Sequence, residues 1–275
     1  MKRKLLGLPI LLFFASTSFT QSIGKVVLNK GQKFIQEATG NILVSQEMMG
    51  QQMQSKIDIS STNTLEVTNV KDTSYSLTNT ITKMKMNMSA MGQDMSYDSD
   101  REDNDSMMSN SMGKMINDPQ SFEISPMGKL ISKSDTTSEL TNNDMMSGLQ
   151  NVLGNSDAFL AMPLKAKAGY SWVDSVDKDG SRSNMTYTIK ELRGNDATVS
   201  VKGAMQMSQK AEAQNVEFTN NSTGAISGEL VIDAKTGIIK QRNTAIETTG
   251  TVEVMGQQIP MTTKTTSQTT LRSAD

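Results

Sequence analysis

The sequence predicts a mainly β protein in which meander hairpins form large antiparallel sheet structure, with one short helix near residues 141–153. Three observations support this fold class. Apolar residues alternate with polar ones at a period of two, turn sequences containing Gly separate these segments, and a single stretch has helical spacing. We expect a signal peptide over residues 1–20 and a single β-rich domain over residues 21–275.

The first twenty residues are typical of a secretory signal peptide. Lys2, Arg3 and Lys4 precede an apolar run over residues 5–15, and small polar residues follow up to Thr20. This pattern marks export, and the apolar run is shorter than the roughly 20 residues that span a bilayer. We therefore predict cleavage after Thr20, a periplasmic or extracellular location, and no transmembrane segment in the mature chain.

Two alternating halves follow, at about residues 24–132 and 168–272. Ser and Thr fill most positions between the apolar residues, which suits the solvated face of a half-buried antiparallel sheet. The alternating sets are Ile57/Ile59, Leu65/Val67, Tyr75/Leu77, Met84/Met86/Met88, Met95/Tyr97, Met185/Tyr187/Ile189, Val199/Val201, Met205/Met207, Leu230/Ile232 and Val252/Val254. This pattern is compatible with one continuous sheet and with two packed halves.

One phase shift interrupts the alternation. Tyr75, Leu77 and Ile81 occupy odd positions, whereas Met84 and the methionines after it occupy even ones. A continuous strand here requires an extra residue, so the sequence predicts a β-bulge near Thr82–Lys83, unless both faces are partly covered.

Hairpin turns are predicted at six places. Residues 177–180, 193–196 and 233–237 combine Asp or Asn with Gly, which provides positive φ. The tripeptide Met-Gly-Gln occurs at residues 49–51, 91–93 and 255–257, each time between alternating segments, so we predict a hairpin tip at all three.

The helical signal lies between the two halves and links them. Thr141 and Asp144 resemble a capping pair, Leu149 and Val152 fall on one face, and Gly154 is a common helix stop.

The composition excludes several kinds of site. The chain has no Cys and no His, so it has no disulfide, no Ser–His–Asp triad and no His-based zinc site. The formal net charge is −2, and it becomes more negative when the signal peptide leaves. Without a basic run, nucleic acid is not an expected partner. We predict a non-enzymatic protein with no catalytic residue, no cofactor and no metal site. The acidic stretch over residues 98–105 is interpreted as a solvated loop.

Several short motifs resemble an uncharacterised family of exported bacterial proteins. They are Gly31-Gln32-Lys33-Phe34, Met91-Gly92-Gln93-Asp94-Met95, Ser125-Pro126-Met127-Gly128-Lys129, Met162-Pro163 and Gly169-Tyr170-Ser171-Trp172. The resemblance covers nearly the whole mature chain and implies an exported protein of Bacteroidota type. It carries no catalytic residue to this sequence.

The 22 methionines supply the functional hypothesis. Met fills irregular cores in place of aromatic residues, and it also lines adaptable apolar binding surfaces. The best functional hypothesis is an apolar ligand or lipid bound on a Met-lined sheet face. The candidate ligand-binding residues are Met84, Met86, Met88, Met95, Met205 and Met207.

Two alternatives remain open from the sequence. The protein is a purely structural or envelope-interaction protein, or its thioether sulfurs bind Cu(I) or Ag(I). Same-face neighbours on a strand lie roughly 6.5–7 Å apart, which is too far for Met84, Met86 and Met88 to share one ion without another segment. The sequence does not indicate an oligomeric state.

Overall fold

A computed structural model describes residues 24–48, 50–90, 92–133, 158–178, 180–213, 216–254 and 256–274. The expected signal peptide and the predicted helix over 141–153 lie outside these residues.

Twelve strands in the described part of the chain pair into a single antiparallel sheet. Their bounds are β1 Lys33–Met48, β2 Gln51–Lys71, β3 Ser74–Ala90, β4 Gln93–Asp98, β5 Pro119–Ile124, β6 Leu130–Lys133, β7 Ser171–Lys178, β8 Ser181–Arg193, β9 Asp196–Ala213, β10 Val216–Asp233, β11 Ile239–Val254 and β12 Gln257–Ser273. One short helix, α1 (Ser106–Met112), continues into a 3₁₀ turn over Gly113–Met115. The mainly β fold class predicted from alternation is confirmed.

Two meanders meet in the middle of this sheet. The strand order is β6-β5-β3-β2-β1-β12-β11-β10-β9-β8-β7, with β4 paired to β3 beyond the end of β5. β1 and β12 form the seam between the halves, in register from Phe34 opposite Ser273 to Gln46 opposite Met261. The two halves of the sequence therefore form one sheet.

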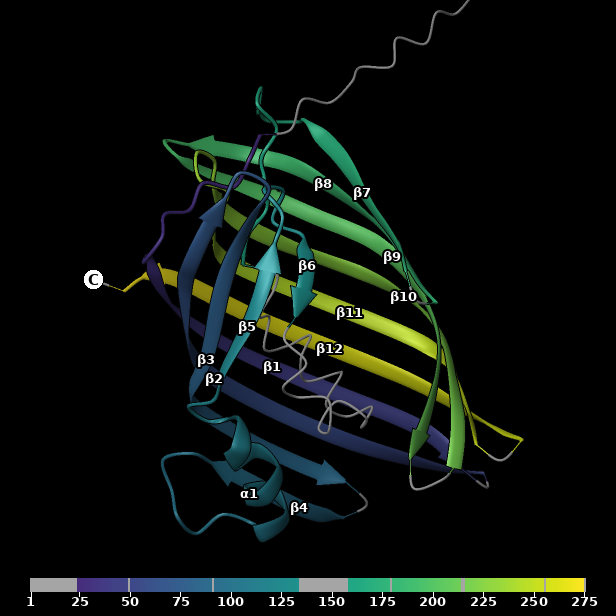
Figure 1. The fold of residues 1–275 in the computed structure, drawn as a ribbon. Helices are drawn as coiled ribbons and strands as arrows, with labels where there is room; N and C mark the ends of the chain where they lie inside the picture. Colours follow the sequence, from purple (N-terminus) through teal and green to yellow (C-terminus); the bar gives the residue numbers. More distant parts are fainter. Residues whose placement is uncertain are drawn as a thin grey trace, which may run out of the picture.

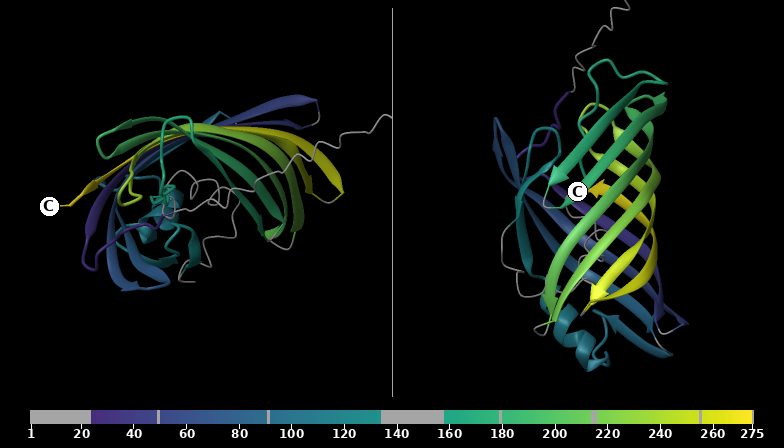
Figure 2. Two further views of the ribbon diagram at one scale, coloured as in Figure 1. Left: turned by 90° about the horizontal axis from the view of Figure 1, so that it is seen from above. Right: turned by 90° about the vertical axis from the view of Figure 1, so that its right-hand side faces the viewer.

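The sheet is strongly curled. β2, β3, β5 and β6 stand in front of the strands from β8 to β12, so the sheet has an inside and an outside (Figure 1). The view from above shows the same curl as an arch (Figure 2, left). Lys129, in the β5–β6 turn, forms an ion pair with Asp174 of the edge strand β7, which ties the two edge regions together.

The predicted turns are confirmed. The three Met-Gly-Gln tripeptides connect β1 to β2, β3 to β4 and β11 to β12, and Gly50, Gly92 and Gly256 have φ angles of 76°, 77° and 78°. The turns near Gly180, Gly194 and Gly237 also have positive φ and join β7–β8, β8–β9 and β10–β11. Glycine meets this requirement without the steric cost that other residues incur.

The predicted bulge is present at Thr82. Thr62 of β2 lies opposite Lys83, whereas Asn63 lies opposite Ile81, so Thr82 is the extra residue. Its hydroxyl donates a hydrogen bond to the carbonyl of Thr62 at 2.9 Å. The bulge places Ile81 and Met84 on the same face of the sheet.

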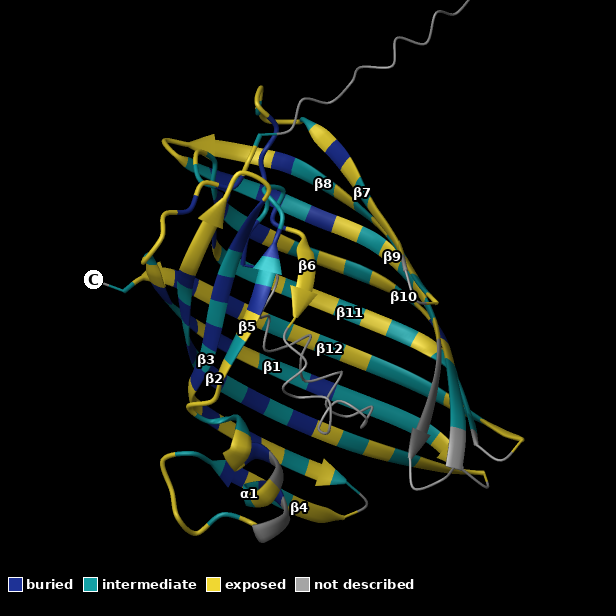
Figure 3. Ribbon diagram, viewed as in Figure 1, coloured by how far each residue is buried: buried dark blue, intermediate teal, exposed yellow. Residues whose placement is uncertain are grey.

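One face of the sheet carries the hydrophobic core, and we call it the inner face. Residues directly opposite each other in antiparallel strands share a face. Phe34 is fully buried and packs its ring against Phe159 at 6.1 Å, which identifies the side with even numbers on β1 as inner. Buried residues gather on β2, β3 and β5, whereas β10–β12 are mainly intermediate or exposed towards their hairpin tips (Figure 3).

Residues 24–28 and 158–163, the end segments, join the halves at one end of the curl. The Val26 amide donates to the carbonyl of Pro126 at 2.7 Å, and the Val27 amide donates to that of Thr236 at 2.8 Å. Tyr75 donates its hydroxyl to the Val26 carbonyl at 2.6 Å. These bonds connect the β5–β6 turn with the β10–β11 turn, so this end of the curl is packed.

Candidate functional site

The inner face remains half-buried along the middle of the sheet. Ile42 of β1 lies opposite Thr265 of β12, which lies opposite Ile246 of β11, which in turn lies opposite Ile226 of β10. These four side chains form one row on the inner face. The next row towards the tips runs through Val44, Thr263, Thr248, Gly224 and Met205. Both rows lie between the packed end and the hairpin tips.

Eight large apolar residues of these and adjoining rows form what we call the apolar inner wall. They are Met185, Met205, Met207, Ile226, Ile246, Val252, Ile259 and Met261. All eight are half-buried, and none belongs to the three clusters of buried residues found in the described part of the chain. Half-buried apolar side chains form a surface that is still in contact with water, so a ligand that covers it lowers the free energy of the complex.

The structure places the six predicted methionines on the inner face in two groups. Met84 and Met86 of β3 are 1% and 0% exposed, and Met88 and Met95 are partly buried against them. Met205 and Met207 of β9 belong to the apolar inner wall instead. Six strand steps separate β3 from β9, which is about 29 Å along the curved sheet.

The β3 group is the core of a small satellite structure. Helix α1 packs Met108 and Met112, 6% and 3% exposed, against β3 and Tyr97 of β4. Isoleucines of β1, β2 and β3 complete this cluster. Packing therefore accounts for Met84 and Met86, which act as core residues. Met88 and Met95 are half-buried at the edge of this cluster, and Met205 and Met207 are half-buried on the apolar inner wall.

The acidic stretch begins at the end of β4, and several of its carboxylates form ion pairs. Lys85 bonds Asp98 at 2.8 Å, and Lys83 bonds Asp100 at 3.0 Å. The hydrogen bond from Lys85 and the amide of Asp100 hold the pKa of Asp98 below its usual value. Among the described residues there is no group of three or more Asp or Glu side chains placed to hold a metal ion.

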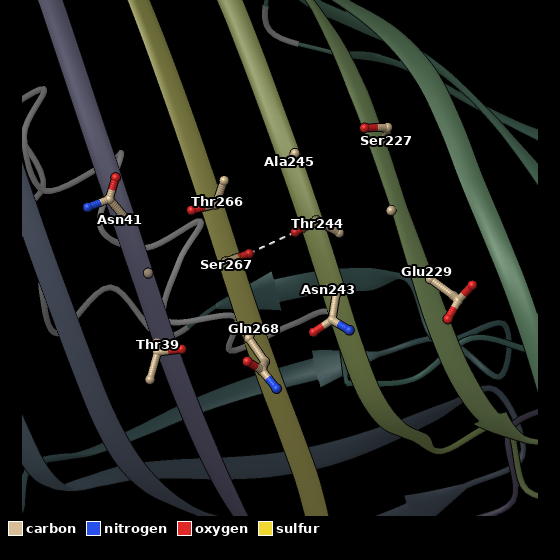
Figure 4. A pocket seen from close by; sticks show the side chains of 12 residues that line it. Thr39, Asn41, Ser227, Glu229, Asn243, Thr244, Ala245, Thr266, Ser267 and Gln268 are labelled. Atoms are coloured by element: carbon tan, nitrogen blue, oxygen red, sulfur yellow. Dashed lines mark hydrogen bonds between the residues drawn. The ribbon is translucent and has the colours of Figure 1, made fainter.

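The outer face has a shallow polar hollow of about 660 Å³ (Figure 4). Its outward-pointing side chains come from β1 and β10–β12 and include Thr39, Asn41, Glu229, Asn243 and Gln268. Glu229 is the one charged residue of its lining. The hollow contains no paired acid and base, so it supports no acid–base arrangement.

Sequence reasoning missed the isoleucines of the wall and the helix α1. Ile226 and Ile246 each stand among Thr, Ser and Gly, so neither belongs to an apolar alternating pair. Their direct opposition appears only when β10 and β11 are in register. The i, i+4 spacing of Met108 and Met112 was the available signal for α1.

No described helix has both the length and the apolar character needed to cross a membrane.

Comparison with solved structures includes a match that shares the overall fold. Lipovitellin, in a structure entitled "Lipid-protein interactions in lipovitellin", aligns with a TM-score of 0.52 and 12% identity. The alignment covers 90% of this chain and 26% of lipovitellin, so this chain spans about a quarter of that protein. An outer membrane channel from Pseudomonas putida F1 aligns over 90% of this chain and 98% of its own, at 10% identity and a TM-score of 0.30. The second score is below the level that indicates a common fold.

One family model matches this sequence, whereas no curated protein does. A model described as a family of unknown function, DUF6263, matches residues 72–146 and 155–239, which is more than half of the chain. The match includes β3, β4, α1 and the strands from β7 to β10. The chain therefore belongs to the DUF6263 family of unknown function.

Proposed function

We propose that this protein is an exported, non-enzymatic binding protein that holds a lipophilic small molecule against the apolar inner wall. The observation that carries this proposal is the half-buried state of eight large apolar residues on the inside of a curled sheet. Covering such a surface contributes about 25 cal/mol per Å² of apolar area removed from water.

The shape of the site supports a small ligand. The wall lies on the inside of the curl, and its neighbours along the rows are threonines, serines and glycines. These small residues leave room between the larger ones, while isoleucine and methionine provide the apolar contact. The structure of lipovitellin, whose fold is similar over part of its length, is titled for its lipid-protein interactions, which supports a lipid as the ligand and provides no residue to transfer.

The basic start and apolar run of residues 1–20 support export. The absence of His and Cys from the chain and the apolar character of the wall support binding without catalysis.

The Cu(I) alternative receives less support from the structure. Met84, Met86, Met108 and Met112 are buried among isoleucines, where a thioether serves as core filler. A structural role in the envelope remains the competing function, and a binding measurement separates the two.

The test uses Ile226→Glu in the purified mature chain. Ile226 faces inward beside Ile246 at the centre of the apolar inner wall. We expect the unaltered protein to bind a fluorescent fatty acid such as cis-parinaric acid. A carboxylate in the wall should weaken this binding about tenfold or more, because a charge opposes an apolar tail.

Ala225→Glu is the matched control, because residue 225 is the sequence neighbour and is exposed on the outer face. This variant should bind like the unaltered protein. If the unaltered protein binds no fatty acid, or if both variants bind equally well, the proposed function is wrong and the structural role is favoured.

A further inference from the structure

A single charged residue faces inward on the strands that form the middle of the sheet. At the inner-facing register positions of β1 and β8–β12, Arg242 of β11 is the one ionisable side chain from Asp, Glu, Lys or Arg. Arg242 lies opposite Thr269 on one side and Leu230 on the other, and both of these residues are buried. Arg242 itself is half-buried, so a cation stands among the uncharged inner-facing positions of these six strands.

The immediate surroundings of Arg242 are small and polar. One pleat along the strand, Thr244 and Ser267 share a hydrogen bond at 2.7 Å between their hydroxyl oxygens. In the same row Gly40 and Gly228 contribute no side chain on either flank. Hydroxyls beside a guanidinium, with two glycines to leave space, form a setting suited to an oxyanion.

Arg242 and the hydroxyls of Thr244 and Ser267 lie at one end of the apolar inner wall. The row of Ile226 and Ile246 follows that of Gly228 and Thr244, and the wall continues from there towards the hairpin tips. In the row of Arg242 itself, Leu230, Val199 and Ile189 follow across β10, β9 and β8 and are part of a buried cluster. A cation therefore stands between a packed core and an open apolar surface.

We infer that the ligand is an anionic amphiphile whose headgroup binds Arg242 and whose tail lies along the apolar inner wall. This inference rests on the proposed function. A guanidinium presents five N–H donors in a planar fork that matches a carboxylate or a phosphate. Arg242 already takes part in an interaction in the structure, and the headgroup would join or replace that contact.

The arrangement of charge supports an anion over a zwitterion or a cation. On the outer face lysines pair with acids, as in Lys264 with Glu247 at 2.9 Å and Lys56 with Asp58 at 2.8 Å. None of the inner-facing register positions of β1 and β8–β12 carries an Asp or Glu that could receive a cationic headgroup. The acid of β7, Asp174, is paired with Lys129.

The experiment compares oleate with oleyl alcohol, which have the same tail and different headgroups, on the purified mature chain. We expect the unaltered protein to bind oleate about tenfold tighter than the alcohol, because a charge-assisted hydrogen bond is lost with the alcohol. Arg242→Gln should remove this preference while it retains binding of the alcohol. Arg242→Lys should keep part of it, and acetate or inorganic phosphate alone should not compete at millimolar concentration.

Arg272→Gln is the control, because Arg272 is an exposed arginine on β12 that pairs with Glu37 at 3.9 Å. This variant should keep the full preference for oleate. Equal binding of oleate and alcohol by the unaltered protein, or an unchanged preference in Arg242→Gln, overturns the headgroup assignment and leaves the proposed function intact. If the unaltered protein binds neither probe, the proposed function itself fails.

Discussion

Asp233 shows how a single side chain fixes a turn in this molecule. Its carboxylate accepts hydrogen bonds from the amides of Lys235 and Thr236, both at 3.0 Å, at the start of the β10–β11 connection. Partial burial acts to raise the pKa of Asp233, but these hydrogen bonds and the nearby Lys240 outweigh it, so the pKa lies below its usual value of 3.8. The carboxylate therefore stabilises the folded chain in its ionised form.

We expect Asp233→Ala to lower the free energy of unfolding at pH 7 by about 2 kcal/mol, because two amides lose a charged acceptor. The folded pKa is depressed, so this contribution is present above pH 3.8 and is lost as the pH falls through the folded pKa. The difference between the two proteins should therefore shrink in acid. Urea unfolding at several pH values measures it.

Asp177→Ala provides the comparison for this prediction. Asp177 pairs with Arg182 on the surface at 2.9 Å, and its side chain is 69% exposed. An exposed ion pair contributes little, so this variant should unfold within about 0.5 kcal/mol of the unaltered protein. If both variants lose the same free energy of unfolding, the hydrogen bonds of Asp233 in the turn contribute no more to stability than an exposed ion pair.

The role of a turn residue such as Asp233 can be predicted from the sequence, whereas the inward direction of Arg242 cannot. Asp233, Thr236 and Gly237 stand together in a turn pattern, so their role is local and readable. The inward direction of Arg242 depends on its opposition to Thr269 and Leu230, which are far away in the chain. Local pattern contains no information about that register.

Among the strands, two local features stand out: the bulge at Thr82 and the close approach of two strands at Gly250. The bulge at Thr82 follows from a change of parity that any reader of the sequence can see. The close approach at Gly250 has no such signal. A Cβ there would meet the carbonyl oxygen of Asn221 and would lie 2.7 Å from the Cα of Ser222, so the neighbouring backbone occupies the space of a side chain.

Gly250→Ala should therefore destabilise the protein by about 2 kcal/mol, because the strands must move apart to accommodate one methyl group. Chemical denaturation measures this loss. Gly113→Ala is the matched control, since a Cβ at residue 113 would have the Tyr97 hydroxyl as its neighbour at 3.9 Å, an ordinary contact. The control should be neutral or slightly more stable. A neutral Gly250→Ala would contradict the tight strand approach described above.

At the scale of the whole molecule, the seam between β1 and β12 makes two halves into one sheet. Sequence leaves that point open because β12 is rich in threonine and offers few apolar residues to identify its neighbour. The pairing is set by the backbone and by the common curl of both meanders. The lone Trp172 is buried in the core of the second half, stacked on Tyr187 at 5.2 Å.

This continuity predicts cooperative unfolding of both halves. Fluorescence of Trp172 reports the second half, and hydrogen exchange at β2 and β3 reports the first. Both should give one urea midpoint, because loss of either half exposes a long unpaired edge at the seam. An earlier transition in one half would show that the seam couples the halves weakly.

The seam also has a consequence for how the chain folds during synthesis. β1 is synthesised early, yet its partner on one side is β12, which is synthesised more than two hundred residues later. Until then the N-terminal meander presents a sixteen-residue strand with open hydrogen-bonding groups. Such an edge readily pairs with strands of other chains, so the nascent protein needs either fast completion of the sheet or a chaperone that covers this edge.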